Sequence, residues 1–388
     1  MKLKVLYLAN IPAPYAVEYF VELGKMCDLT VIYERTAASD RDIKWTSDAR
    51  ITYSQIFLKG KNIGTENSWC PSVTDYLKTS YDAIIIGTYS SFTAMWAISY
   101  LRRHRIPYII SSDGGFIAEG ENFLKRRLKT SLIGNAQAWI SSGENTNKYL
   151  KYYGAKEENI FIYPFTSLSE KDILSEDVDF ETKTAIREEL NLKGKNIVVG
   201  VGQFIYRKGW DILVKAVKLL NEKNPDHFSD THYYIIGGTA EDFRKQIVEA
   251  GLSVENIPDN IHTVEFADRE TVFKYYRASN ISILPTREDI WGLVVNEAMA
   301  NSIPVITTDR CLAGLELIQN DVNGYLFKSE NYCELAEKIE KIFDRDLQEM
   351  GRKAIEAISG YTYSVMAEKT VDMVKVLKGN NIPSEEKL

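Results

Sequence analysis

Residues 282–309 place an apolar run, an acidic loop, a helix-forming stretch and a second apolar run directly after one another. The first run, SILP, reads as a buried strand that stops at Pro285, because proline has no N–H to donate to a neighbouring strand. The stretch GLVVNEAMA, which begins at Gly292, has helical periodicity, and IPVITT reads as the next buried strand. A strand, a helix and a strand in this order predict a parallel α/β sheet. Ligands of such sheets bind at the loops that leave the carboxyl ends of the strands.

The start of the expected helix suits a phosphate group. The N–H groups around Gly292, Leu293 and Val294 have no acceptor inside a helix and attract anions. Gly292 also has no Cβ, so a ligand can approach closely. Glu297 follows about one turn further on and is a natural acceptor for a pair of sugar or ribose hydroxyls.

Two acids, Glu288 and Asp289, lie in the loop just before this helix. Either carboxylate can face a ligand bound at the helix start. Acids at this position can also serve only to complement the positive end of the helix dipole. The spacing alone therefore leaves both interpretations open.

A second motif, residues 198–220, reads as a strand, a glycine-containing turn, a basic pair and a helix. Gly202 lets the backbone approach a ligand, and Gln203 follows it in the turn. Arg207 offers a planar fork and Lys208 a point charge beside a diphosphate. The motif is neither a P-loop nor a complete dinucleotide fingerprint. A solvated basic loop at a strand end is the alternative interpretation.

The two motifs together resemble the donor-binding elements of family-4 glycosyltransferases, which are retaining enzymes of the GT-B fold. That family has two acids separated by seven residues with Gly-Leu between them, a spacing that Asp289 and Glu297 match. Asp289 stands where the family usually has Glu, and the neighbouring Glu288 is an equal candidate for the role. Lys208 matches a diphosphate-binding lysine of the family.

Gln203 departs from the family, because relatives usually carry Arg at its position. We expect Arg207 to supply the missing positive charge. The resemblance also extends along the continuation ITTDRCLAGLELIQNDVNGYLF, where Cys311 and Leu312 stand near positions at which the family often has glycines.

The resemblance implies an α/β fold of the GT-B type, with two Rossmann-like domains whose parallel sheets face each other across a cleft. Apolar runs and helical patterns alternate in both halves of the chain, as that fold requires. We expect an N-terminal acceptor-side domain over residues 1–170, a nucleotide-sugar-binding domain over 171–360, and a C-terminal helix and tail over 361–388 that cross back towards the first domain. The polar stretch 169–179 is the expected linker. Residues 37–64 interrupt the alternation and predict a loop or a short β excursion facing the acceptor.

The segment ANIPAPYAVEYF fits a loop after the first strand. Many relatives have a pair of glycines there, and this chain is similar to a subset with Asn-x-Pro-x-Pro-Tyr instead. The resemblance implies that Asn10, Pro14 and Tyr15 form an acceptor-side loop. A rigid, proline-kinked turn without a ligand is the alternative.

The segment SSDGGF follows another expected strand. Relatives often place a His, close to the transferred sugar, at the position of Asp113. Asp113 is expected to hold a sugar hydroxyl, and Gly114 and Gly115 let this loop approach the donor. A DGG turn with no ligand role explains the same residues.

Composition excludes several other classes. A net charge of −7 disfavours a duplex nucleic-acid binder. The four cysteines form no Cys-x-x-Cys pair, and no paired-histidine motif predicts a metal site or a cofactor. The amino terminus reads as a first strand and no apolar run is long enough to cross a bilayer, so we expect a cytoplasmic protein. One basic stretch, residues 124–133, predicts either a helix that docks on the inner face of an anionic membrane or a solvated helix with a buried apolar side.

The sequence thus predicts a glycosyltransferase of the hexosyltransferase type, which works in polysaccharide biosynthesis. It would move a sugar, with retention and without a metal, from a nucleoside diphosphate linked to uridine or guanosine to a hydroxyl of a glycan or lipid-linked acceptor. Lys208, Arg207 and the helix start at Gly292 would neutralise the departing diphosphate. Asp289 or Glu288 would touch the sugar and Asp113 would line the opposite wall. A UDP-sugar 2-epimerase of the same fold and a non-catalytic nucleotide-sugar-binding subunit are the alternatives.

Overall fold

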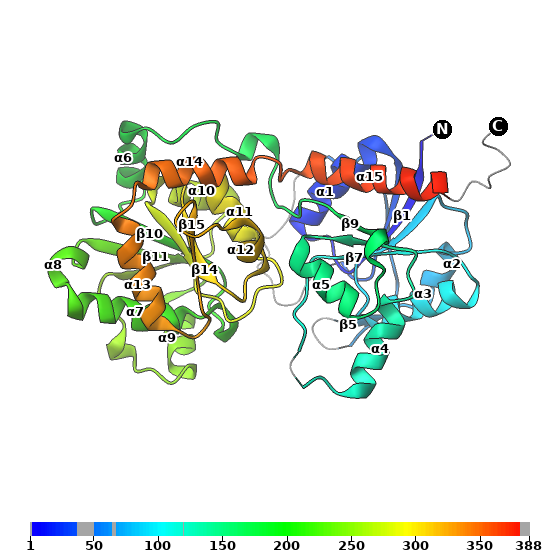
Figure 1. Ribbon diagram of the computed structural model, residues 1–388, viewed down its shortest axis with the longest axis horizontal. Helices are drawn as coiled ribbons and strands as arrows, with labels where there is room; N and C mark the ends of the chain where they lie inside the picture. Colours follow the sequence, from blue (N-terminus) through cyan, green and yellow to red (C-terminus); the bar gives the residue numbers. More distant parts are fainter. Residues whose placement is uncertain (1, 37–49, 64–66, 119, 381–388) are drawn as a thin grey trace. The chain divides into compact units, whose positions relative to one another are not determined.

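The computed structural model describes residues 2–36, 50–63, 67–118 and 120–380 (Figure 1). The chain divides into two compact units. Unit 1 comprises Met1–Thr166 and Tyr361–Leu388, and unit 2 comprises Ser167–Gly360. The first crossing between the units therefore falls four residues before the boundary expected at residue 170. Residues 169–179, the expected linker, belong to unit 2.

Within its described residues, unit 1 contains a seven-stranded parallel sheet with the strand order β3-β2-β1-β6-β7-β8-β9. The strands are β1 (Lys4–Ala9), β2 (Asp28–Tyr33), β3 (Ser54–Phe57), β6 (Ala83–Ile86), β7 (Ile109–Ser112), β8 (Ala138–Ser141) and β9 (Ile160–Ile162). The helices are α1 (Pro14–Met26), α2 (Val73–Tyr76), α3 (Phe92–Arg103), α4 (Phe123–Ile133), α5 (Glu144–Tyr152) and α15 (Tyr363–Asn380), with a 3-10 turn η1 (Glu157–Asn159). Strands β6, β7 and β8 are buried along their whole length, as expected for a parallel sheet covered on both faces.

The segment 37–64 was expected to be a loop or a short β excursion. Its residues 37–49 and 64 lie outside the described residues. Ser54–Phe57 form β3, an edge strand of the main sheet that runs parallel to β2. Lys61–Ile63 form β4, which pairs antiparallel with β5 (Asn67–Trp69).

Unit 2 repeats the architecture with a six-stranded parallel sheet in its described residues, in the order β12-β11-β10-β13-β14-β15. The strands are β10 (Asn196–Val201), β11 (Thr231–Ile236), β12 (Ile261–Val264), β13 (Ile281–Leu284), β14 (Val305–Thr308) and β15 (Gly324–Phe327). The α-helices are α6 (Phe180–Glu189), α7 (Trp210–Lys223), α8 (Pro225–Phe228), α9 (Ala240–Glu249), α10 (Arg269–Ala278), α11 (Leu293–Ala300), α12 (Leu312–Leu317), α13 (Tyr332–Phe343) and α14 (Leu347–Ile358). Short 3-10 turns are η2 (Glu170–Asp172), η3 (Tyr206–Lys208) and η4 (Val254–Asn256). The predicted α/β fold with two Rossmann-like halves is confirmed.

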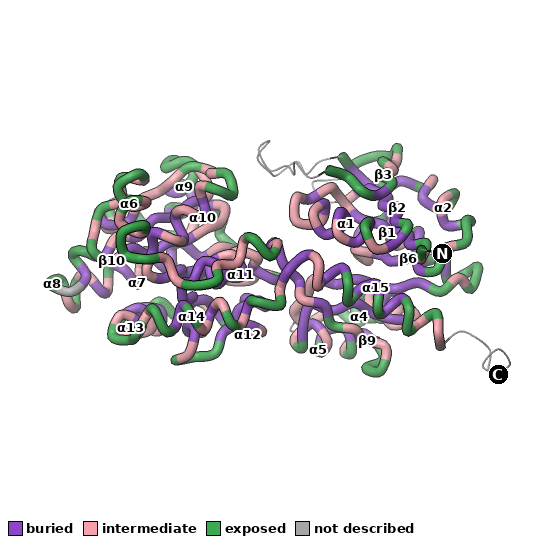
Figure 2. Tube along the Cα trace, turned by 90° about the horizontal axis from the view of Figure 1, so that it is seen from above, coloured by how far each residue is buried: buried purple, intermediate pink, exposed green. Residues whose placement is uncertain are grey.

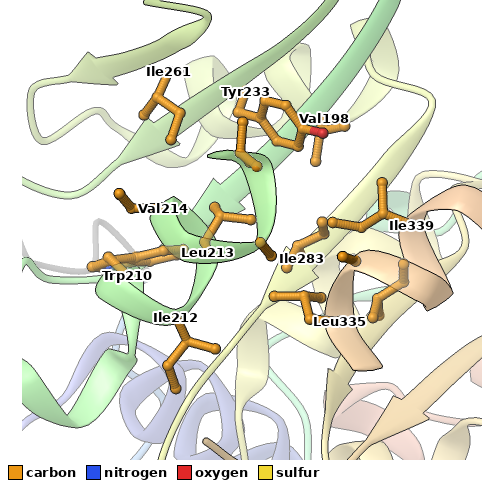
Figure 3. Close-up of a cluster of buried hydrophobic side chains, with 14 of the residues drawn as sticks. Val198, Trp210, Ile212, Leu213, Val214, Tyr233, Ile261, Ile283, Leu335 and Ile339 are labelled. Carbon is orange, nitrogen blue, oxygen red and sulfur yellow. The ribbon is translucent and has the colours of Figure 1, made fainter. Parts of the chain in front are cut away.

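The core of unit 2 lies between the central strands and the helices α7 and α13 (Figure 3). Trp210, at the start of α7, is fully buried against this sheet, and its side chain lies so close to Gly200 that a Cβ there would clash. Burial in both units follows the strands and the inward faces of the helices, and the outer faces are exposed (Figure 2).

Helix α15 packs against α1 within unit 1 (Figure 1). The hydroxyls of Tyr19 and Thr370 share a buried hydrogen bond of 2.9 Å between these two helices. Lys378 Nζ donates to Asp82 at 2.7 Å near the helix end. Unit 1 is therefore built from two segments of the chain that are remote in sequence.

Candidate functional site

The candidate site of unit 2 lies at the carboxyl ends of β10 and β13. These strands are parallel neighbours in the sheet, so the loops that follow them leave from the same edge. The two loops are hydrogen-bonded to each other through the carbonyl of Arg207. That carbonyl accepts from the Thr286 hydroxyl at 3.0 Å and from the Arg287 N–H at 2.8 Å.

An ion pair joins the same two loops. Lys208 Nζ lies 2.5 Å from Asp289 Oδ2, and the two side chains are only 12% and 14% exposed. Arg207 lies further out, with its Nη1 at 3.6 Å from Asp289 Oδ1 and 2.9 Å from the carbonyl oxygen of Glu288. The structure thus brings together the basic pair and one of the two predicted acids.

The other predicted acid points elsewhere. The Glu288 carboxylate pairs with the guanidinium of Arg310 and is about half exposed. Two backbone hydrogen bonds fix Asp289 to the segment after β14. The Asp289 N–H donates to the carbonyl of Arg310, and the Asp289 carbonyl accepts from the N–H of Leu312. Of the two predicted acids, Asp289 is the one whose carboxylate lies beside Lys208.

The helix start predicted at Gly292 is the start of α11. Gly292 caps the helix in the left-handed region, with a φ of 99°, and a Cβ there would lie 2.7 Å from Cys311 Sγ. Both features require glycine. Leu293 and Val294 form the first turn, whose N–H groups have no acceptor within the helix.

Glu297 lies in the second turn of α11 and is half-buried. Its Oε1 accepts a hydrogen bond of 2.8 Å from the Ser167 hydroxyl. Burial raises the pKa of Glu297, and the positive charge of Arg269 opposes that rise. Arg269 in turn donates to the carbonyl of Ser167 at 2.5 Å and to Asp172 at 3.0 Å. Ser167, the first residue of unit 2, is therefore hydrogen-bonded to Glu297, the acid expected to hold ribose hydroxyls.

The glycine turn after β10 is also close to Lys208. A Cβ on Gly202, whose φ is 153°, would lie 3.4 Å from the Lys208 side chain. The Gln203 carbonyl accepts from the indole N–H of Trp210 at 3.1 Å. This bond ties the turn to the core helix that follows it.

Sequence reasoning missed the group that holds this site together. Arg287, in the loop after β13, donates to both carboxylate oxygens of Asp211 at 2.8 and 2.7 Å. It also donates to the carbonyl of Tyr206 at 2.6 Å and lies over the Tyr206 ring at 3.8 Å. Glu330 binds the outer side of the guanidinium. Arg287 therefore clamps the turn η3, which carries Arg207 and Lys208, to the loop that carries Asp289.

In unit 1, Asp113 follows β7 in a tyrosine-rich environment. Its Oδ1 accepts from the Tyr163 hydroxyl at 3.4 Å, and its carbonyl accepts from Ser142 at 2.9 Å. Burial raises the pKa of Asp113 to about 6. Gly114 has a φ of 145°, and a Cβ on Gly115 would lie 2.7 Å from the Tyr149 ring, so both positions need glycine for structural reasons.

The predicted loop position of Pro14 and Tyr15 is wrong, whereas that of Asn10 is right. Asn10 lies in the loop and its Oδ1 accepts from Arg35 Nε at 3.1 Å. Pro14 and Tyr15, however, are the first residues of α1. Proline suits the first helical position, where its missing N–H would have no partner anyway. The Tyr15 ring packs edge-on against Phe165, at 5.7 Å between centroids.

Two absences concern only the part of the chain that the structure describes. No group of three or more His, Cys, Asp or Glu side chains there is arranged to hold a metal ion. No helix there combines the length and apolar character needed to cross a membrane.

Part of the chain resembles a known protein family. Residues 182–359 match the family "Glycosyl transferases group 1". A D-inositol 3-phosphate glycosyltransferase of Corynebacterium diphtheriae is 24% identical over 257 residues, which cover 64% of this chain and 58% of that protein. A Campylobacter jejuni relative, N,N'-diacetylbacillosaminyl-diphospho-undecaprenol alpha-1,3-N-acetylgalactosaminyltransferase, is 22% identical over 294 residues, or 73% of this chain and 72% of that protein. The chain thus spans less than two thirds of the length of the first of these relatives.

Solved structures show the same fold over nearly the whole chain. Sucrose-phosphate synthase from Thermosynechococcus elongatus has a TM-score of 0.74 at 18% identity, covering 97% of this chain and 99% of its own. Anabaena HepE in complex with UDP has a TM-score of 0.73 at 16% identity, covering 96% and 100%. The fold is that of the GT-B glycosyltransferases. The family match over residues 182–359, which contain the Lys208–Asp289 pair, supports a glycosyltransferase.

Proposed function

We propose that the protein transfers a sugar from a nucleoside diphosphate to a hydroxyl of a glycan or lipid-linked acceptor, with retention and without a divalent metal. The Lys208–Asp289 pair carries this proposal. It places a shielded cation at the carboxyl edge of the sheet, where a bound diphosphate would need a counter-charge. The Asp289 carboxylate, 2.5 Å from Lys208 Nζ, would compete with a diphosphate for this cation.

The donor would be held by groups of unit 2. Lys208 and Arg207 pair with the diphosphate, and the N–H groups at the start of α11 bind its oxygens. Glu297 accepts bonds from the ribose hydroxyls, and Asp289 from a hydroxyl of the sugar. Anabaena HepE was solved with UDP and with UDP-glucose, which supports a uridine-linked donor.

The reaction would proceed at one face of the sugar. The bond between the anomeric carbon and the diphosphate oxygen breaks, and a bond to the acceptor oxygen forms on the same side. The acceptor's proton passes to the departing phosphate oxygen, so no side chain acts as a covalent nucleophile. The positive groups around Lys208 stabilise the negative charge that develops on the leaving group.

The acceptor class rests on one relative. The Campylobacter jejuni protein is named for an acceptor carried on diphospho-undecaprenol, which supports a lipid-linked acceptor in glycan assembly. The relatives described above carry glycosyltransferase names, and this favours transfer over epimerisation or a purely sensory role.

A thermal-shift screen against UDP-, GDP- and ADP-linked sugars tests the donor site. A ligand that binds only the folded protein raises its Tm. We expect one donor to raise the Tm of the wild type and of Lys218→Met, which removes an exposed lysine of α7. The same donor should not raise the Tm of Lys208→Met. Equal stabilisation of Lys208→Met would remove this lysine from the donor site.

Turnover is tested separately with the preferred donor and lipid-linked or short glycan acceptors in the presence of EDTA. Transfer with the anomeric configuration kept, at an undiminished rate, is the expected outcome. Loss of transfer on chelation, or inversion at the anomeric carbon, would contradict the proposed chemistry.

A further inference from the structure

The first two turns of α4 carry large apolar side chains that the fold leaves uncovered. Phe123 is 71% exposed, Leu124 70% and Leu128 49%, whereas Leu132 and Ile133, at the end of the helix, are buried. In Figure 1 the amino-terminal end of α4 extends away from the sheet of unit 1. One of the two alternatives expected from the sequence was a solvated helix with a buried apolar side. Only the last turn of α4 fits that expectation.

The orientation of α4 is set by contacts on its opposite side. Arg126 lies over the ring of Tyr152, 4.3 Å from the centroid. Lys129 pairs with Glu121 at 2.7 Å and donates to the Tyr153 hydroxyl at 3.2 Å. Positions 126 and 129 are three residues apart and share one helix face, so this face is fixed on α5.

The outward face combines apolar and basic groups. We call it the α4 patch, and it consists of Phe123, Leu124, Lys125, Arg127 and Leu128. All five are exposed. Lys125 and Arg127 form no ion pair within the described residues. The nearby Glu121 carboxylate is occupied by Lys129. The patch is thus locally positive in a chain whose net charge is −7.

We propose that the α4 patch docks unit 1 on an anionic lipid surface. Phe123, Leu124 and Leu128 enter the boundary between headgroups and acyl chains, as the apolar face of an interfacial helix does. Lys125 and Arg127 lie at the level of the lipid phosphates, which attract basic side chains near the bilayer. Lipid is favoured over a protein partner because uncompensated basic side chains stand among the apolar ones. Charged residues, and lysine in particular, are depleted in the core of protein interfaces.

This inference concerns a surface of unit 1 and does not depend on the donor chemistry proposed for unit 2. It predicts a protein held at the bilayer by one helix without crossing it. A site near a lipid-linked acceptor would follow from it, but lipid binding can be measured without any acceptor.

Flotation of the full chain with vesicles tests the proposal. We expect binding to phosphatidylcholine vesicles that contain phosphatidylglycerol, weaker binding at high salt, and little binding to phosphatidylcholine alone. The variant Phe123→Ser/Leu124→Ser should lower the partition coefficient by about tenfold or more. Lys125→Gln/Arg127→Gln should remove most of the salt dependence.

A matched control removes two exposed apolar side chains from unit 2. Phe180 is 83% exposed and Val248 55%, and the variant Phe180→Ser/Val248→Ser should bind vesicles like the wild type. Equal binding by the Phe123→Ser/Leu124→Ser variant, or no binding of the wild type to anionic vesicles, would overturn the proposal.

Two measurements separate the other outcomes. The Phe123→Ser/Leu124→Ser variant should keep the far-UV circular dichroism and the donor-induced Tm shift of the wild type, so that a lost donor site is not mistaken for lost docking. Size-exclusion chromatography without lipid reveals self-association. A wild-type dimer that the double substitution converts to a monomer, together with absent vesicle binding, would assign the α4 patch to a second copy of the chain and refute lipid docking.

Discussion

Lys208 Nζ lies 2.5 Å from Asp289 Oδ2, so one shielded ion pair links the loops that follow two neighbouring strands of unit 2. Each partner balances the charge of the other. An incoming diphosphate therefore has to compete with Asp289 for the ammonium group, and a sugar hydroxyl can take over the carboxylate.

Removing this competition should separate binding from turnover. The variant Asp289→Asn leaves Lys208 without its carboxylate, so the affinity for free UDP should rise, by roughly threefold to tenfold. Transfer should fall, because the proposed contact with the sugar is weakened. Calorimetric titration with UDP and a transfer assay measure the two effects.

The adjacent acid provides the control for that experiment. Glu288 pairs with Arg310 on the other side of the loop, so Glu288→Gln should change UDP affinity by less than about twofold. An equal gain in both variants would point to a general loss of negative charge instead of the release of Lys208.

The clamp between Arg287 and Asp211 should contribute strongly to stability. Asp211 is 1% exposed and both of its carboxylate oxygens accept from the guanidinium. Arg287→Met leaves this buried carboxylate without its main partner, and we expect a loss of about 3–5 kcal/mol in the unfolding free energy. The exposed pair of Arg345 and Asp321 is the comparison, since Arg345→Met should cost less than about 1 kcal/mol. Urea denaturation measures both, and similar losses would show that Arg287 is not a clamp.

A side chain at position 292 should lower the stability of the protein through two separate effects. The φ of 99° at Gly292 strains any other residue, and a Cβ would lie 2.7 Å from Cys311 Sγ. Gly251 has a similar φ of 82° but open space around it. Gly251→Ala should cost about 1 kcal/mol from backbone strain alone, and Gly292→Ala about 1–3 kcal/mol more from overpacking. Melting temperatures of the two variants check this, and equal shifts would contradict crowding at Cys311.

The partly buried Asp113 should make stability depend on pH. Burial raises its pKa to about 6 in the folded protein, so the folded state binds its proton more tightly than the unfolded chain does. The unfolding free energy contributed by this group therefore falls as the pH rises through the range between the unfolded and the folded pKa, and it stays low above about pH 6.

Asp113→Asn removes that penalty. It should be more stable than the wild type by up to about 3 kcal/mol at neutral pH, and the difference should shrink towards about pH 4. The neighbouring Tyr163 has a raised pKa and does not titrate in this range. Urea midpoints of both proteins at several pH values give the difference, and a difference that stays constant with pH would refute this role of Asp113.

The strands and the loops of the candidate site could be predicted because their signals are local. SILP and IPVITT are short apolar runs that stop at residues incompatible with a strand or at polar loops, and they form β13 and β14. The positions of Gly292 and Lys208 in the segments that follow strands β13 and β10 are predicted by the same alternation. The directions of adjacent side chains in a loop depend on contacts with segments that are remote in the chain. Glu288 and Asp289 face different partners because backbone hydrogen bonds from the segment after β14 fix the turn.

Other features depend on contacts between residues remote in the chain. Arg287 and Asp211 are separated by 76 positions, and neither neighbourhood identifies the other. Pro14 begins a helix, although the sequence around it also fits a kinked loop. The two cases cannot be told apart from proline alone, because neither a first helical position nor a loop position needs the N–H that proline lacks. The spacing of Phe123, Leu124 and Leu128 shows which residues share a face of α4, but it does not show whether another element covers that face.

Helix α15 gives the molecule a particular order of assembly. Because this helix supplies part of unit 1 and comes last in the chain, a ribosome has already released all of Ser167–Gly360 before the partner of α1 emerges. Until α15 emerges, unit 1 lacks one of its helices and the surface around Tyr19 stays uncovered. Released chains that are truncated after Gly360 should accordingly contain a protease-resistant second unit and a first unit that remains open to cleavage.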